Sequence, residues 1–157
     1  MENIGTKRDF LRFRYVVALQ QLDINAPAQW GKMNVMQMIE HMSDYVRIAN
    51  GRTALNLVTP EDVLPKMVAF LESEKPFKEN TPNSLMSDTP PAVKSDSKAT
   101  ALIELQGEIN HLFDVFNAHP DQKIMNPFFG PLSFDQQVQL LYKHSTHHLR
   151  QFGSTAN

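Results

Sequence analysis

Three of the six histidines of this chain lie within five positions of one another, in the segment YKHSTHHLRQFG from Tyr142 to Gly153. His144 and His148 are four residues apart, so on an α-helix both imidazoles lie on one face, about 6 Å apart along the axis. Two imidazoles at this spacing are able to bind one metal ion, as in helical H-x-x-x-H sites. Pairing of His147 with His144, at three-residue spacing, is the less favourable alternative.

A metal site on this segment needs a third ligand from elsewhere in the chain, and His41 offers it. Asn34 and Gln37 have the spacing of a helix capping box, and apolar residues follow at helical intervals. His41 lies at the edge of that apolar stripe, so it is able to face His144 and His148 if the two helices are neighbours. Three neutral imidazoles would leave a divalent ion with an open coordination position, as in catalytic zinc sites.

The histidines also have an interpretation without a metal, because many H-x-x-x-H pairs are simply solvated. A second candidate is the E-x-x-H formed by Glu108 and His111, which has the form of a di-iron ligand motif. The chain contains no second copy of that motif, so a solvated helix face is the preferred interpretation. Glu40, Asp44 and Asp114 are candidates to orient a ligand imidazole, and the sequence does not choose among them.

Four helical segments are expected to position these residues, at about residues 6–22, 34–51, 96–118 and 133–152. In the first segment, Phe10, Phe13 and Leu19 are among the residues expected to face the core. No convincing alternation typical of strands occurs between the segments. The sequence therefore predicts an all-α protein, a four-helix bundle, that forms one domain over residues 1–157.

The segment between the second and third helices holds six of the ten prolines. Glu61 to Leu71 is predicted to be a short helix with a proline kink. Lys75 to Ser95 is predicted to be irregular and to pack over one end or side of the bundle, because proline removes backbone donors and breaks helices. A further loop, NPFFGPL from Asn126 to Leu132, carries two phenylalanines that line either the core or the mouth of a substrate site.

Composition excludes several classes of function. The chain has no cysteine, which excludes disulfides, thiolate metal sites and cysteine nucleophiles. Its 15 basic and 17 acidic residues include no basic cluster, so nucleic acid is not an expected partner. No apolar run approaches the roughly 20 residues that span a bilayer, and the first residues lack the pattern of a signal peptide. We therefore expect a cytoplasmic protein without a membrane partner.

Several short motifs along the chain occur together in one known family. They are Trp30-Gly31-Lys32-Met33, Glu40-His41-Met42, Asn126-Pro127-Phe128-Phe129-Gly130, Tyr142-Lys143-His144 and His147-His148-Leu149-Arg150-Gln151-Phe152-Gly153. On these motifs the chain resembles the DinB/YfiT-like superfamily of four-helix-bundle metalloproteins, and most of all a bacterial branch of it. The resemblance implies that His41, His144 and His148 bind one divalent metal, and Gln151 fits the histidine-x-x-glutamine ending of the family motif. The chain departs from that branch at DQQVQLL, residues 135–141, where the branch usually has a tryptophan, which concerns packing and not the ligands.

The resemblance implies a metal but leaves the reaction open. Zinc or nickel is the first expectation, with manganese and iron as alternatives. Superfamily relatives include thiol-dependent transferases and an isomerase, so we expect a metal-dependent transferase or hydrolase with a small-molecule substrate, such as a low-molecular-weight thiol. The alternative is a non-catalytic metal-binding or metal-stabilised bundle that acts as a sensor or partner-binding module. No catalytic residue is assigned, and a homodimer is expected.

Overall fold

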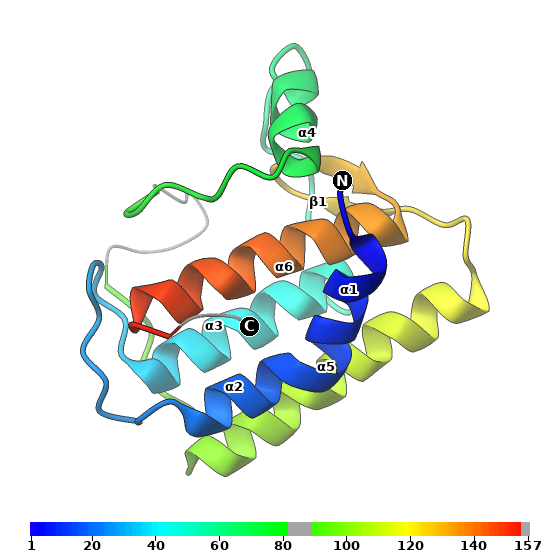
Figure 1. Cartoon of the computed structure of the whole chain (residues 1–157). Helices are drawn as coiled ribbons and strands as arrows, with labels where there is room; N and C mark the ends of the chain where they lie inside the picture. Colours follow the sequence, from blue (N-terminus) through cyan, green and yellow to red (C-terminus); the bar gives the residue numbers. More distant parts are fainter. Residues whose placement is uncertain (82–88, 155–157) are drawn as a thin grey trace.

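The computed structural model describes residues 1–81 and 89–154. Its first helical segment consists of α1 (Ile4–Asp9), a π-helical turn η1 (Phe10–Arg14) and α2 (Tyr15–Gln21). The other long helices are α3 (Val35–Ala49), α5 (Lys98–Ala118) and α6 (Phe134–Gln151). These segments lie side by side, with α3 between α5 and α6 (Figure 1). The predominantly helical architecture predicted from the sequence is confirmed.

The two helices that carry the histidines both begin at capping boxes. At the start of α3, Asn34 Oδ1 accepts a hydrogen bond from the Gln37 backbone at 2.8 Å, and Gln37 Oε1 accepts one from the Asn34 backbone at 2.9 Å. Ser133 and Gln136 repeat this arrangement at the start of α6. Each box satisfies backbone N–H groups that have no partner inside the helix, so both predicted starts are confirmed.

The core lies mainly between the long helices. The third predicted helix buries the residues expected on its inner face, which include Leu105, Ile109 and Leu112. α3 likewise buries the whole of its predicted apolar stripe, which contains Met38 and Met42. Within the two described ranges, no helix has the length and apolar character needed to cross a membrane.

The first helical segment contains a π-helical turn that the sequence did not predict. A π-turn inserts one residue into the helical register, so the residues that follow it rotate to a different face. Leu11 and Tyr15 are therefore buried with Phe10, whereas the side chain of Phe13 is 62% exposed. The prediction that Phe13 faces the core is wrong, because it assumed 3.6 residues per turn throughout.

Among the described residues between α3 and α5 there is one short helix, α4 (Leu64–Glu72), which projects from the group of long helices (Figure 1). Pro65 lies in its first turn, where the missing N–H leaves no hydrogen bond unmade, so the predicted kink does not form. Residues 75–81 and 89–95 contain no helix or strand, as expected for an irregular segment. The rest of the stretch predicted to be irregular, residues 82–88, lies outside the described residues.

The loop before α6 forms a small β-hairpin instead of an irregular turn. β1 (Ile124–Asn126) pairs antiparallel with β2 (Gly130–Leu132), and Asn126 Oδ1 accepts hydrogen bonds from the Phe128 and Phe129 backbone at 2.9 and 3.1 Å. Strands of three residues are too short to show the alternation that identifies strands in a sequence. The hairpin is therefore a feature that the sequence did not predict, in a chain that is otherwise mainly helical as expected.

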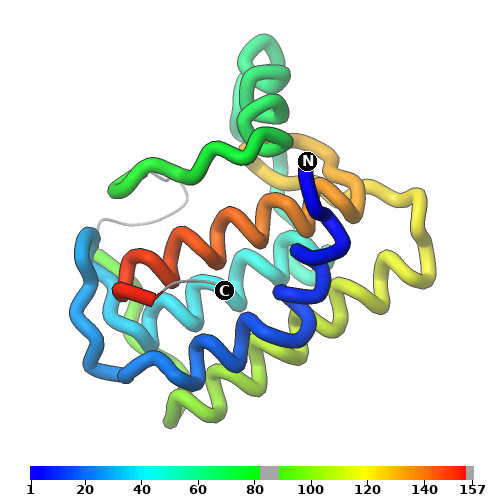
Figure 2. Tube along the Cα trace, viewed as in Figure 1, coloured from blue at the N-terminus to red at the C-terminus, as the bar shows by residue number. Residues whose placement is uncertain are grey.

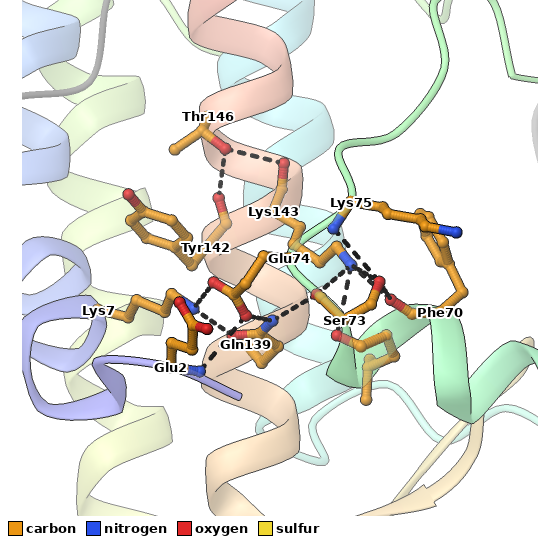
Figure 3. A network of polar contacts seen from close by, with 11 residues as sticks. Glu2, Lys7, Phe70, Ser73, Glu74, Lys75, Gln139, Tyr142, Lys143 and Thr146 are labelled. Atoms are coloured by element: carbon orange, nitrogen blue, oxygen red, sulfur yellow. Dashed lines mark hydrogen bonds and ion pairs between the residues drawn. The ribbon is translucent and has the colours of Figure 1, made fainter.

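A network of polar side chains fastens the chain around α4 to α6 (Figure 3). Lys143 donates hydrogen bonds to the carbonyl groups of Phe70 and Ser73 at 2.5 and 2.8 Å, at the C-terminal end of α4. Glu74 accepts hydrogen bonds from Lys7 of α1 and from Gln139 of α6. As Figure 2 shows, the chain after α4 then turns back over α6, and this network holds it there.

Candidate metal centre

His41 of α3 meets His144 and His148 of α6 inside the protein. A ring nitrogen from each lies within 4.8 Å of the others, and the Nε2 atoms of His41 and His144 are 3.0 Å apart. Among the residues that the structure describes, these three are the one group of histidine, cysteine or acidic side chains close enough together to hold an ion. The structure thus brings together the three residues that the spacing and the resemblance selected.

The three imidazoles are held in their neutral form. Burial lowers the pKa of His41 to about 4, and the nearby His147 adds to the shift. Burial and the neighbouring histidines lower the pKa of His148 to about 3, although the hydrogen bond with Gln151 acts in the opposite direction. Burial also lowers the pKa of His144 well below its ordinary value, and the nearby His148 and His41 add to the effect. A neutral imidazole is the form that binds a metal, so the cluster is ready to receive a cation at neutral pH.

The orientation of His148 is fixed by Gln151, one turn further along α6. The Gln151 side chain donates from Nε2 to the Trp30 carbonyl at 2.9 Å, so its oxygen is left to face His148 Nδ1 at 2.7 Å. Nδ1 then carries the proton, and Nε2 is an acceptor. This Nε2 is buried and has no hydrogen-bond partner, which is the state expected of an atom that binds a cation. The residues present therefore fit a metal ion.

Gly31 allows the loop before α3 to approach Gln151 closely. Its φ of 76° lies in the left-handed region, and a Cβ atom at this position would lie 2.8 Å from Gln151 Nε2. The same loop donates a hydrogen bond from the Gln29 backbone to the Gln151 carbonyl at 2.8 Å. The Trp30-Gly31 motif thus has a physical role, because it places the carbonyl that orients Gln151.

His147 lies beside the cluster and does not belong to it. Its ring is packed with centroids 5.4 Å from Trp30 and 5.9 Å from Phe77, and it forms a hydrogen bond with the Phe77 backbone. Phe77 also contacts His144, at 6.1 Å between ring centroids. Of the two pairings that the sequence left open, the structure places His144 with His148, while His147 helps to build the wall around them.

The carboxylates considered as orienting groups have other partners or lie at the surface. Glu40 accepts hydrogen bonds from the backbone that precedes α5. Asp44 pairs with Arg47, and Asp114 is exposed. The orienting residue is instead Gln151, which sequence reasoning noted only as part of a family motif. The feature of the sequence that could have identified Gln151 is its three-residue spacing from His148, which places both side chains on one helix face.

Glu108 of the E-x-x-H motif serves the packing of α5 and not a metal. Its carboxylate accepts hydrogen bonds from Asn50 at 3.0 Å and Arg52 at 2.8 Å, and it lies 3.4 Å from Arg47. With these cationic and amide partners, the oxygens of Glu108 are already engaged. The di-iron alternative therefore has no support in the structure.

A cavity of about 460 Å³ borders the three histidines. Its wall is largely apolar, and Lys32 is the one lysine, arginine or acidic side chain among the described lining residues. The phenylalanines of the hairpin, Phe128 and Phe129, line the cavity and also pack against a second hydrophobic cluster with Leu71 and Leu132. These phenylalanines thus combine the two roles that the sequence left open, core packing and the lining of a cavity.

The fold and the site define a helical protein with a buried three-histidine cluster beside an apolar cavity. The chain matches the family model of the DinB superfamily over residues 9–152, and it belongs to this superfamily. The resemblance inferred from its motifs is thereby confirmed. No curated protein and no solved structure matches the chain.

The metal-free protein is expected to lose stability as the pH falls from 7.5 to 5. In the folded state the pKa values of His41 and His148 are about 4 and 3, whereas unfolded imidazoles bind protons near pH 6.5. Below pH 6.5 the unfolded chain therefore binds more protons, and the free energy of unfolding decreases, by about 1 kcal/mol or more at pH 5.

Urea denaturation of the chelated protein at the two pH values measures this change. The control is His148→Leu, which removes one buried imidazole and should show a smaller loss between pH 7.5 and 5. An unfolding free energy that is equal or greater at pH 5 than at pH 7.5 would contradict the assignment of neutral, buried histidines.

Proposed function

We propose that this protein binds one divalent metal through His41, His144 and His148 and acts as a metal-dependent transferase that uses a thiol, or as a hydrolase. The observation that carries the proposal is the buried Nε2 of His148, which lacks a partner beside two other neutral imidazoles. A buried acceptor without a donor costs about 1–3 kcal/mol, and a bound cation would remove that cost. Imidazole ligands suit zinc and nickel first, with manganese and iron as alternatives.

The surroundings of the cluster favour a catalytic over a closed structural site. In the described part of the chain, three histidines are close enough together to bind the ion. They border a cavity large enough for a small molecule. When bound, a divalent ion supplies Lewis acidity and lowers the pKa of a thiol or water that joins it. The protein's own contribution is to orient His148 through Gln151, and to shield the imidazoles with Phe77 and Tyr45, whose rings lie against them.

A non-catalytic role as a metal-stabilised bundle or sensor is the second candidate. It is supported by the origin of the ligands, because His41 belongs to α3 and the other two histidines belong to α6. An ion held by all three would cross-link the two helices and stabilise the fold by its binding free energy. Turnover of a thiol and an electrophile by the loaded protein would decide for the enzyme.

The metal proposal predicts different effects for two adjacent histidines. His148→Ala removes a ligand and should abolish tight binding, whereas His147→Ala should retain the metal because its ring packs against Trp30 and Phe77. Metal content is measured by elemental analysis after chelation and reloading with zinc, nickel or manganese. Loss of the ion from His147→Ala together with its retention by His148→Ala would show that the wrong histidine was chosen. Metal-free parent protein after all three reloadings would refute the site.

The orienting role of Gln151 predicts a weaker but intact metal site when its amide is removed. Gln151→Leu leaves all three imidazoles in place but frees the ring of His148, so the metal affinity should fall about 10–100-fold. Competition with a chelator of known affinity measures this change. Gln20→Leu, an exposed glutamine on α2, is the matched control and should bind the metal as the parent does. An unchanged affinity in Gln151→Leu would remove the orienting role.

We also propose that residues 1–157 form one domain and that two copies associate. Phe13 and Val17, four residues apart on the first helical segment, expose 62% and 48% of their surfaces, and Ile103 on the neighbouring α5 exposes 75%. Large apolar side chains that stay exposed on neighbouring helices are able to pair with a partner. Sedimentation equilibrium should give the mass of two chains at micromolar concentration, and the mass of one chain would exclude the homodimer.

A further inference from the structure

One side-chain amide oxygen of a residue that lines the cavity has no hydrogen-bond partner. Gln137 near the start of α6 is fully buried, and its Nε2 donates to the Ile124 carbonyl of β1 at 3.1 Å. This bond fixes the side-chain amide and leaves Oε1 buried without a donor. Gln137 lines the same cavity as the three histidines. Buried acceptors without partners are rare in proteins and are costly, so this oxygen calls for a ligand.

A second buried glutamine on the same helix shows that the missing partner is not a general consequence of burial. Gln139 accepts a hydrogen bond from Lys7 Nζ at 2.8 Å and donates to the Ser73 carbonyl at 2.9 Å and to Glu74 at 3.0 Å (Figure 3). Gln139 faces the polar network and not the cavity. The unpartnered oxygen of Gln137 is therefore specific to the helix face that carries the histidines.

The spacing along α6 sets the distance between this oxygen and the metal centre. Gln137 precedes His144 by seven residues, which is two helical turns, or about 10 Å along the axis. Leu140 and Leu141 lie between them and line the cavity. An apolar path thus joins an unpaired hydrogen-bond acceptor at one end to the histidine cluster at the other.

We propose that Gln137 determines substrate specificity by accepting a hydrogen bond from an N–H or O–H group of an elongated, uncharged and largely apolar substrate. The wall is largely apolar and has Lys32 as its one lysine, arginine or acidic side chain among the described lining residues, which favours an uncharged molecule. The reacting end of the substrate lies at the histidine cluster, and this part of the inference rests on the proposed function. The hydrogen bond to Gln137 itself requires no metal.

Two probes that share one hydrocarbon chain, one with an N–H donor and one without, test this assignment. Octanamide carries an N–H donor on a hydrocarbon chain, and N,N-dimethyloctanamide lacks the donor. Trp30 is the only tryptophan and lines the cavity, so its fluorescence reports the entry of either probe. Zinc-loaded parent protein should bind octanamide about tenfold more tightly than the dimethyl amide, the effect of one hydrogen bond to a buried acceptor.

Two variants complete the comparison as a cycle of probe and residue. Gln137→Met keeps the length of the side chain but removes the acceptor, so the tenfold preference should disappear. Leu140→Met is the matched control on the same wall, because the exchange conserves volume and should keep the preference. A preference that persists unchanged in Gln137→Met would overturn the assignment.

If Gln137→Met does not fold, the comparison of the two amides on the parent protein still tests the role of Gln137. Equal binding of the two amides to the parent would mean that the oxygen has no ligand to recognise, and no fluorescence response to either amide would exclude this substrate class. The same titration on chelated protein separates this inference from the metal proposal. A donor preference without metal binding would retain Gln137 as the recognition residue, and metal binding without a preference would retain only the metal site.

Discussion

The structure depends on one constraint, which is that three neutral imidazoles from two helices must converge in the protein interior. The Nε2 atom of His148 is buried and has no protein donor as a partner. Such an arrangement is stable only if the surrounding fold fixes the spacing and rotation of α3 and α6 relative to each other. Two features help to fix these helices, namely the capping boxes at their starts and the buried apolar stripe of α3.

Segments that are distant in sequence also help to hold the histidines of α3 and α6 in position. The loop at residues 29–31 reaches the end of α6 through two hydrogen bonds with Gln151, and Gly31 makes that approach possible. The chain after α4 is tied to α6 through Lys143, which places Phe77 against His144. A set of imidazoles held in fixed positions in this way needs support from its surroundings as much as it needs the imidazoles themselves.

The sequence predicted those features that depend on local spacing. The capping boxes, the apolar faces of α3 and α5, and the pairing of His144 with His148 follow from helical spacing and are seen in the structure. The approach of His41 to that pair depended on the two helices being neighbours, which the family resemblance implied. The π-turn of the first helical segment, in which Phe13 is exposed, was not predicted from the spacing of the apolar residues. The roles of Gln151 and Gln137 depend on the Trp30 and Ile124 carbonyls, which are brought close only by the tertiary fold.

The buried polar residues of α6 fall into two groups that differ in how they are satisfied. On one face, Gln139 and Lys143 have their donors and acceptors paired with the chain around α4, so their role is to position that chain. On the face towards the cavity, Gln137 and His148 each keep one buried acceptor without a partner. A folded protein usually satisfies its buried polar groups, and here it does so a few residues away on the same helix. The two unsatisfied atoms are the ones that we propose as binding atoms, one for a cation and one for the donor group of a substrate.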